Sequence, residues 1–188
     1  MEKGFEKTSG GLIRIAVTGP ESTGKSQLSR ELAAHYHTVF VPEYAREYID
    51  KLNREYNYDD LEIIAKGQIA AQEKSEKNAN RLLVCDTELT VIKIWAEHKY
   101  HKCPDWVSEN LLNYPYDLYL LCNVDIPWES DPQREHPQLR SFFFDWYYKE
   151  LKDRNARVQV IEGTGIARFY KALQAIENLL IKKHDTHF

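Results

Sequence analysis

A glycine-rich segment near the N-terminus constrains this chain more than any other feature. Residues 19–26 read GPESTGKS and match the pattern G-x-x-x-x-G-K-[ST], a loop whose backbone N–H groups surround phosphates. In this pattern the lysine, here Lys25, reaches the β- and γ-phosphates, and the serine hydroxyl, here Ser26, can ligate Mg²⁺. The segment therefore predicts that ATP and Mg²⁺ bind. The candidate ATP contacts are Gly19, Glu21, Ser22, Thr23, Gly24, Lys25, Ser26 and Gln27.

The residues on both sides of this loop support the prediction. Residues 12–17 form a mostly apolar, β-branched run that predicts a buried strand. Beyond the loop, Leu28, Leu32 and Ala33 recur at helical spacing. The loop then lies between a strand and a helix N-terminus, where the helix dipole and free amides favour anions. Pro20 is unusual, because it removes one amide donor directly after the first glycine.

Length and composition limit the classes of protein to consider. The 188 residues, 43% of them apolar, predict one domain with a substantial core: a flexible segment 1–11, a domain 12–184 and a tail 185–188. The net charge of −4 argues against a nucleic-acid partner, and no apolar run approaches the roughly 20 residues that cross a membrane. Three unpaired cysteines and a polar start predict a cytoplasmic protein with reduced thiols. The oligomeric state stays open.

Apolar runs alternate with helical patterns along the whole domain. We expect strands over residues 12–17, 38–42, 82–86, 117–122 and 157–161, and helices from residue 26 and over 59–80, 88–100, 104–113, 138–154 and 166–183. This alternation predicts an α/β fold, a five-stranded parallel sheet with helices on both faces. Ligands of such sheets bind beyond the carboxyl ends of the strands, which directs attention to the residues that follow each strand.

Carboxylates and an arginine follow two of these strands. Asp86 ends an apolar run, which suits a carboxylate that supports Mg²⁺ together with Ser26. The alternative is that Asp86 or Thr87 only caps the next helix. Glu43 and Arg46 follow another strand and either face a substrate or begin a solvated helix.

A polar stretch follows the fourth predicted strand. We expect a mobile lid loop over about residues 123–140, with Arg134 free to move and Arg140 near a helix start. Arginines on a closing lid can neutralise charge that gathers on a transferred phosphoryl group. The alternative is an ordinary solvated loop. The aromatic tract 142–148 is expected to pack the following helix against the sheet.

Four segments together resemble the ribosylnicotinamide kinase domain of bacterial NadR proteins. They are GPESTGKS, PEYARE, CDTELTVIKIWAEHKY and YPYDLYLLCNVDIPWESDPQR, and the resemblance runs from about Ile13 to the closing helix. It implies a P-loop NTPase fold of the nucleoside and nucleotide kinase type. It also implies ATP-dependent phosphorylation of nicotinamide riboside to nicotinamide mononucleotide, a step of NAD salvage.

The resemblance also implies roles for individual residues. Lys25 and Ser26 would hold the triphosphate and metal, and Asp86 would support Mg²⁺. The implied substrate contacts are Glu43, Tyr44, Arg46, Asp86, Trp95 and Tyr100, and the catalytic set is Lys25, Glu43, Asp86, Arg134 and Arg140. An aromatic face suits a cationic pyridinium, although Trp95 fits an ordinary core position equally well. Whether Glu43 or Asp86 accepts the proton stays open.

One departure from the family leaves other functions to consider. NadR proteins typically carry an upstream adenylyltransferase domain, whereas only residues 1–11 precede the first predicted strand. We therefore expect neither adenylyltransferase nor repressor activity, unless the chain is a fragment. The alternatives are a kinase for another nucleoside or nucleotide, and a binding module in which the nucleotide regulates contacts with a protein partner.

Overall fold

Five parallel strands form the central sheet of the computed structural model, which describes residues 11–185. Their order is β2-β3-β1-β4-β5. The strands are β1 (Ile13–Thr18), β2 (Phe40–Val41), β3 (Leu82–Asp86), β4 (Leu118–Cys122) and β5 (Val158–Ile161). The side chains of β3 and β4 are buried throughout, because helices cover both faces of the sheet. The predicted five-stranded parallel sheet is confirmed.

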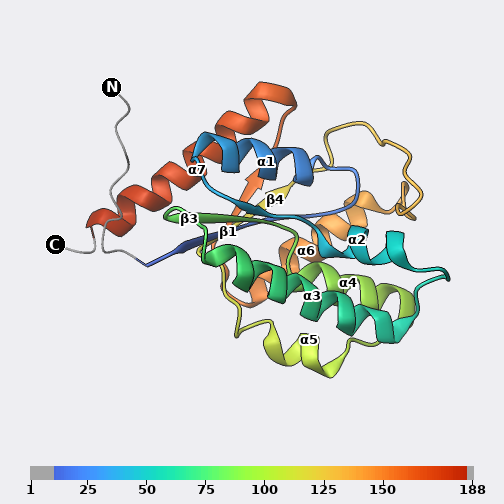
Figure 1. Cartoon of the computed structure of the whole chain (residues 1–188). Helices are drawn as coiled ribbons and strands as arrows, with labels where there is room; N and C mark the ends of the chain where they lie inside the picture. Colours follow the sequence, from blue (N-terminus) through green and yellow to red (C-terminus); the bar gives the residue numbers. More distant parts are fainter. Residues whose placement is uncertain (1–10, 186–188) are drawn as a thin grey trace.

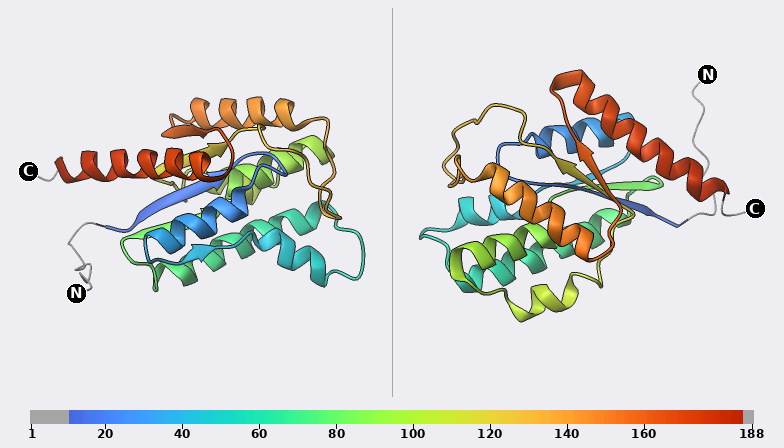
Figure 2. Two further views of the ribbon diagram at one scale, coloured as in Figure 1. Left: turned by 90° about the horizontal axis from the view of Figure 1, so that it is seen from above. Right: turned by 180° about the vertical axis from the view of Figure 1, so that it is seen from behind.

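Seven helices surround this sheet in the described residues. They are α1 (Lys25–His35), α2 (Tyr44–Lys51), α3 (Tyr58–Glu76), α4 (Leu89–Tyr100), α5 (Asp105–Asn110), α6 (Arg140–Asp153) and α7 (Gly165–Asp185). Helices α1 and α7 cover one face (Figure 1). Leu28, Leu32 and Ile176 of these helices pack on β1 and β4. Helices α3, α4 and α6 cover the other face, with α5 outside α3 and α4 (Figure 2). None of the described helices is long and apolar enough to span a bilayer.

The register of the sheet brings two distant segments together. Val17 in β1 pairs with Asp86 at the end of β3, and Thr18 pairs with Leu121 in β4. The loop after β1 therefore begins between the ends of β3 and β4. The loop 123–139 and α2 lie at the same edge of the sheet, on the right in Figure 1.

Several local predictions need correction. Strand β2 has two residues instead of five, because it pairs only with β3 and Pro42 cannot donate a backbone hydrogen bond. The sequence offers a helix start at Glu43 and Arg46 only as one alternative, whereas the structure has a complete helix there, α2. Helix α4 begins after Glu88, whose side chain accepts from the Thr90 amide at 2.8 Å, so the cap is neither Asp86 nor Thr87.

The aromatic tract packs only in part. Phe143 and Tyr147 are buried, whereas Phe142 and Tyr148 are exposed. The reason is helical spacing: residues four positions apart share a face, and α6 turns only that face inward. Residues 1–10 and 186–188, which hold most of the predicted flexible segment and of the tail, lie outside the described residues.

Candidate active site

The phosphate loop, residues 19–26, connects β1 to α1 and depends on glycine backbone conformations. Gly19 has a φ of 131°, and a Cβ there would lie 2.9 Å from the Cys122 carbonyl oxygen. Gly24 also has a positive φ, 75°, at the N-terminus of α1. The Lys25 ammonium donates to the Pro20 carbonyl at 2.7 Å, so its charge lies over the loop itself. The first turn of α1 and the lysine thus present positive charge to the same space.

A cavity of about 960 Å³ opens beside this loop. The phosphate loop and Gln27 form one end of it, α2 and α4 form the other end, and the loop 123–139 covers it. We call residues 123–139 the lid loop, since α6 begins at Arg140. The volume is at the upper end of the range typical of ligand pockets, roughly 300–1,000 Å³. Predicted site residues that line it beyond the loop are Glu43, Arg46, Trp95, Tyr100 and Arg134.

Asp86 lies beneath the cavity, next to the phosphate loop, and is 2% exposed. Burial raises the pKa of its carboxyl from 3.8 to about 6, and the charge of Glu43 acts in the same direction. Ser26 and Lys25 oppose the shift. The Oδ1 atom is buried and has no hydrogen-bond partner among the described residues.

An orphaned carboxylate oxygen beside a serine hydroxyl suits a hard cation. Mg²⁺ usually keeps waters and binds through one or two protein oxygens together with substrate phosphates. The described residues contain no cluster of three or more His, Cys, Asp or Glu side chains that could hold a metal ion. The donor set of Ser26 and Asp86 therefore fits a metal that arrives with a triphosphate.

Glu43 and Arg46 lie together at the start of α2. The Arg46 Nε donates to Glu43 at 3.1 Å, and its Nη1 donates to Asp131 of the lid loop at 2.9 Å. Tyr44, which was expected to contact the substrate, points elsewhere. Its ring packs on α3, where a Cβ at Gly67 would lie 2.0 Å from the Tyr44 Cε1 atom, and Tyr44 is absent from the cavity lining. The helical turn that brings Glu43 and Arg46 to the cavity directs Tyr44 into the core.

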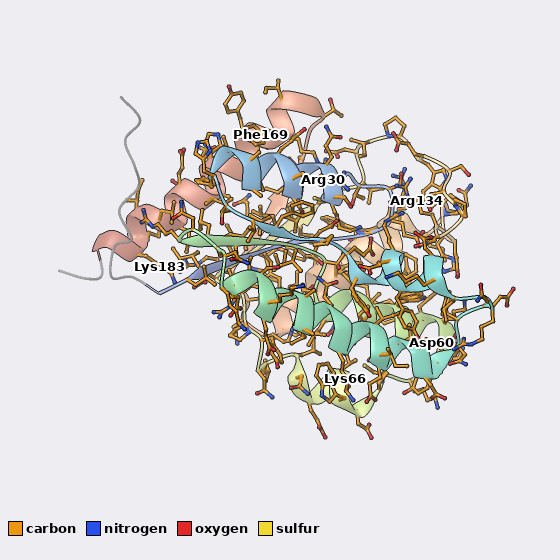
Figure 3. All side chains as sticks on the ribbon, viewed as in Figure 1. Arg30, Asp60, Lys66, Arg134, Phe169 and Lys183 are labelled. Carbon is orange, nitrogen blue, oxygen red and sulfur yellow. The ribbon has the colours of Figure 1, made fainter. Side chains whose placement is uncertain are left out.

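The two predicted lid arginines are anchored. Arg134 lies beside the N-terminal end of α1 (Figure 3) and its side chain is 17% exposed, with Nη1 2.5 Å from the Glu129 carbonyl oxygen. Arg140 donates to the carbonyl oxygens of Ser22 at 3.1 Å and Ile126 at 3.0 Å. The Nε atoms of both arginines are buried without a partner among the described residues. The lid loop is thus folded over the phosphate loop, in contrast to the unanchored loop that its composition predicts.

Glu21 and Ser22, predicted to contact ATP, contact the lid loop. The Glu21 carboxylate accepts from the backbone amides of Glu135 at 3.1 Å and His136 at 3.2 Å. The Ser22 hydroxyl accepts from the Glu129 amide at 2.8 Å. Both residues also line the cavity. Glu21 and Ser22 stand at variable positions of the phosphate-loop motif, and both bind the lid loop.

Aromatic side chains from the segment before α3 and from α4 also line the cavity. The Trp95 and Tyr56 rings pack edge to face at 4.7 Å, and Trp95 Nε1 donates to the Tyr56 hydroxyl at 3.0 Å. Tyr100 packs on Tyr58, with ring centroids 5.5 Å apart. We call Tyr56, Trp95, Lys99 and Tyr100 the acceptor wall. Trp95 is partly buried against a core cluster and also lines the cavity.

Sequence reasoning missed two buried charged residues next to the phosphate loop. Arg168 in α7 is 6% exposed and binds Asp125 at 2.6 Å. It also donates to three backbone carbonyls, those of Thr23, Asn123 and Gly163. No sequence signal marks it, because an arginine within a helical pattern usually faces solvent.

Glu88 is the second missed residue. The segment CDTEL indicated only Asp86, although Glu88 is equally buried. Its carboxylate accepts from the Thr18 hydroxyl at 3.1 Å and caps α4, and it does not line the cavity. Glu88 therefore connects the end of β1 to the start of α4 by hydrogen bonds.

The comparisons with known proteins agree with this geometry. A family model described as "AAA domain" matches residues 14–168. The trifunctional NAD biosynthesis/regulator protein NadR of Salmonella typhimurium is 26% identical over 175 residues, which are 88% of this chain and 42% of that protein. The chain therefore spans less than half the length of this curated relative.

Solved structures show the same fold. NadR in complex with NAD and AMP-PNP superimposes with a TM-score of 0.74 at 25% identity, over 89% of this chain and 49% of that one. NadR in complex with NR gives 0.75 at 23% identity, over 89% and 50% of the two chains. Thymidylate kinase of Ehrlichia chaffeensis gives 0.63 at 16% identity, over 90% and 100%. The fold is that of the P-loop nucleoside and nucleotide kinases, and the resemblance to NadR inferred from the sequence is confirmed.

Proposed function

The chain belongs to the AAA domain family, and from this premise we propose that it phosphorylates nicotinamide riboside with ATP to give nicotinamide mononucleotide. One observation carries the proposal. The cavity extends from a complete phosphate loop to a separate acidic and aromatic end, so it offers room for a second small molecule beside a triphosphate. A nucleotide-dependent binding module has no need of that second compartment. The names of the relatives, one bound to NR and one to AMP-PNP, support this choice of substrates.

The nucleotide half of the cavity would hold and neutralise the triphosphate. In this half, Lys25 leaves the Pro20 carbonyl to bind phosphate oxygens, and the amides at the start of α1 stabilise the same charge. Ser26 and Asp86 would hold Mg²⁺. When bound, the ion would supply charge neutralisation to the β- and γ-phosphates.

The acceptor half would orient and deprotonate the ribose hydroxyl. Glu43 lines the cavity and is held by Arg46, whereas Asp86 lies beneath the lining. We therefore assign Glu43 to the proton of the attacking 5′-hydroxyl and Asp86 to the metal. The rings of Trp95 and Tyr100 face the same space and suit a cationic pyridinium, since aromatic faces attract positive charge.

The lid arginines would act on the phosphoryl group during transfer. The Nε atoms of both arginines are buried without a hydrogen-bond partner among the described residues, and Arg134, though not Arg140, lines the cavity. Donors of this kind stabilise charge that develops in the transition state and cost little reorganisation. The same loop would exclude water and so protect the phosphoryl group from hydrolysis.

A kinase for a different nucleoside is the second candidate, and Lys99 favours it. The Lys99 ammonium lies 3.9 Å from the centroid of the Tyr56 ring, on an aromatic face that a cationic ring would otherwise use. A neutral or anionic base would meet no repulsion from this lysine. The choice between the two acceptors therefore depends on whether Lys99 moves when substrate binds.

The test is a substrate screen with ATP and Mg²⁺. Nicotinamide riboside, adenosine, cytidine, uridine, thymidine and nucleoside monophosphates are compared by kcat/KM, and we expect nicotinamide riboside to give the highest value. The Lys25→Ala variant serves as the control, since it should remove transfer while the circular dichroism spectrum stays that of the parent. A much larger kcat/KM for another nucleoside would contradict the substrate, and absence of transfer to any acceptor would favour a binding module.

A further inference from the structure

Residue 135 of the lid loop contacts both halves of the cavity. Its backbone amide donates to Glu21 of the phosphate loop at 3.1 Å. Its carboxylate accepts from the Tyr56 hydroxyl at 2.8 Å and lies 3.3 Å from the Lys99 ammonium. Glu135 therefore contacts the nucleotide half through its main chain and the acceptor wall through its side chain.

The contacts on the nucleotide side are made by backbone groups. Two successive amides, those of Glu135 and His136, converge on one Glu21 oxygen. A carboxylate next to phosphates would repel them, so these two donors also offset a charge that the phosphate loop would otherwise expose. Any rearrangement of Glu21 when a triphosphate binds must move the segment around residue 135.

The contacts on the acceptor side converge on one hydroxyl. The Tyr56 oxygen accepts from Trp95 Nε1 and from Lys99 and donates to Glu135. A ring that enters beside Trp95 must adjust this group of side chains. Among the described residues, Glu135 is the lid-loop residue that these side chains bind by hydrogen bonds and an ion pair. Movement of the acceptor wall is thus transmitted to the same residue.

We propose that Glu135 is a positioning residue that links the binding of the two substrates. This inference rests on the proposed function, because it assigns a coupling role within that same site. A residue that both ligands displace makes each affinity depend on the other, and by linkage the two effects are equal in size. Coupling between sites in proteins is commonly about 5-fold to 150-fold in affinity.

The test measures that coupling directly. The Kd of a non-hydrolysable ATP analogue is determined without and with saturating nicotinamide riboside. We expect the riboside to lower the Kd of the parent by about 5-fold or more, and to change that of Glu135→Ala by less than about twofold. Glu135→Gln should be intermediate, because its amide oxygen can still accept from Tyr56 and Lys99 but lacks the negative charge that pairs with Lys99. Glu109→Ala, at an exposed glutamate of α5, is the matched control and should behave like the parent.

Two results would overturn the inference. One is an unchanged coupling factor in Glu135→Ala, even if both separate affinities fall, since that would make the residue merely structural. The other is a parent protein that binds both ligands without coupling.

Failure of the substrate assignment would look different. If nicotinamide riboside does not bind at all, amide hydrogen exchange decides the role of Glu135 without an acceptor. The ATP analogue alone should slow exchange in residues 54–58 of the parent and leave it unchanged in Glu135→Ala. Equal slowing in the two proteins would reject coupling through this residue.

Discussion

The nucleotide half of the cavity is built mainly from backbone, whereas the acceptor half is built mainly from side chains. Around the phosphate loop, Arg168 donates to the carbonyl oxygens of Thr23 and Asn123 and so fixes the path of the chain. In the acceptor half, Glu43, Arg46 and Trp95 face the cavity directly. Phosphates can be bound by amides of any sequence with the correct backbone, but a particular nucleoside needs particular side chains.

Because of this difference, substitutions in the two halves should affect their ligands in different ways. In the nucleotide half a buried side chain affects ATP through the backbone that it holds. In the acceptor half a side chain affects the acceptor through its own charge or ring. The lid loop spans both halves, because it contacts Ser22 and Glu21 on one side and Arg46 and Tyr56 on the other.

The largest effects are expected from the lid arginines. Arg134→Ala and Arg140→Ala should each lower kcat by about 10³-fold with a smaller change in ATP affinity, since their donors act on charge that changes during transfer. Lysine in either place should restore activity only partly, because it lacks the planar fork of arginine. Both kcat and the Kd of ATP are measured for the four variants.

The kcat and Kd values of these variants also test the assignment of Arg140 to the chemical step. Arg140 donates only to carbonyl oxygens among the contacts described. If Arg140→Ala weakens ATP binding more than it lowers kcat, Arg140 acts as Arg168 does, by fixing the backbone around the phosphate loop. If both alanine variants turn over within about twofold of the parent, a change under roughly 0.5 kcal/mol, the lid loop has no catalytic role.

The two carboxylates should separate by their response to Mg²⁺. Glu43→Gln and Asp86→Asn should each lower kcat by about 10²-fold or more, because each removes a charge that the reaction uses. Raising Mg²⁺ should partly restore Asp86→Asn, whose weakened metal binding is overcome by mass action, and should not restore Glu43→Gln. Titrations of kcat against Mg²⁺ check this, and the reverse pattern would exchange the two roles.

The strand, loop and helix around the phosphate loop could be predicted from the sequence because that information is local. The phosphate-loop residues are contiguous, and the buried strands that position Asp86 beside them are short apolar runs. Helix α2 was missed as a helix because it has eight residues and buries fully only Ala45, so it leaves little periodic signal.

The acceptor half could not be predicted in the same way. Tyr56 and Glu135 lie 79 positions apart, and no pattern in either segment encodes their contact. The buried position of Arg168 could not be predicted for a related reason. Its partners are backbone carbonyls of three separate loops, and carbonyls carry no sequence signature.

Removal of Arg168 should cost stability as well as ATP affinity. Arg168→Met would leave Asp125 and three carbonyls without their donor, which should lower the free energy of unfolding by about 3 kcal/mol. Lys171→Met is the matched control on the same helix. Its pair with Glu162 is 50% and 55% exposed at the two side chains and should contribute under about 1 kcal/mol. Urea unfolding of both variants checks this, and equal losses would show that Arg168 holds no more than a surface pair does.

The last effect depends on pH and concerns Asp86 without Mg²⁺ or nucleotide. Its pKa is raised by burial from 3.8 to about 6, so the folded protein binds a proton more tightly than the unfolded chain does. This carboxyl therefore stabilises the fold most below pH 4, and the contribution is lost as the pH rises through 6. Since one pKa unit corresponds to about 1.4 kcal/mol, Asp86→Asn should gain up to about 3 kcal/mol relative to the parent between pH 4 and pH 8.

Asp60 provides a control of opposite sign. It is also buried, but the Arg54 guanidinium holds its pKa below the ordinary value, so its contribution is present at neutral pH and falls as the pH drops below about 4. Asp60→Asn should therefore be destabilised most at neutral pH. Urea unfolding of the parent and both variants in EDTA, from pH 3 to pH 8, gives the differences, and only their change with pH is compared, so that any constant packing effect cancels. If the difference in free energy of unfolding between Asp86→Asn and the parent does not change with pH, water reaches this carboxylate and burial does not raise its pKa.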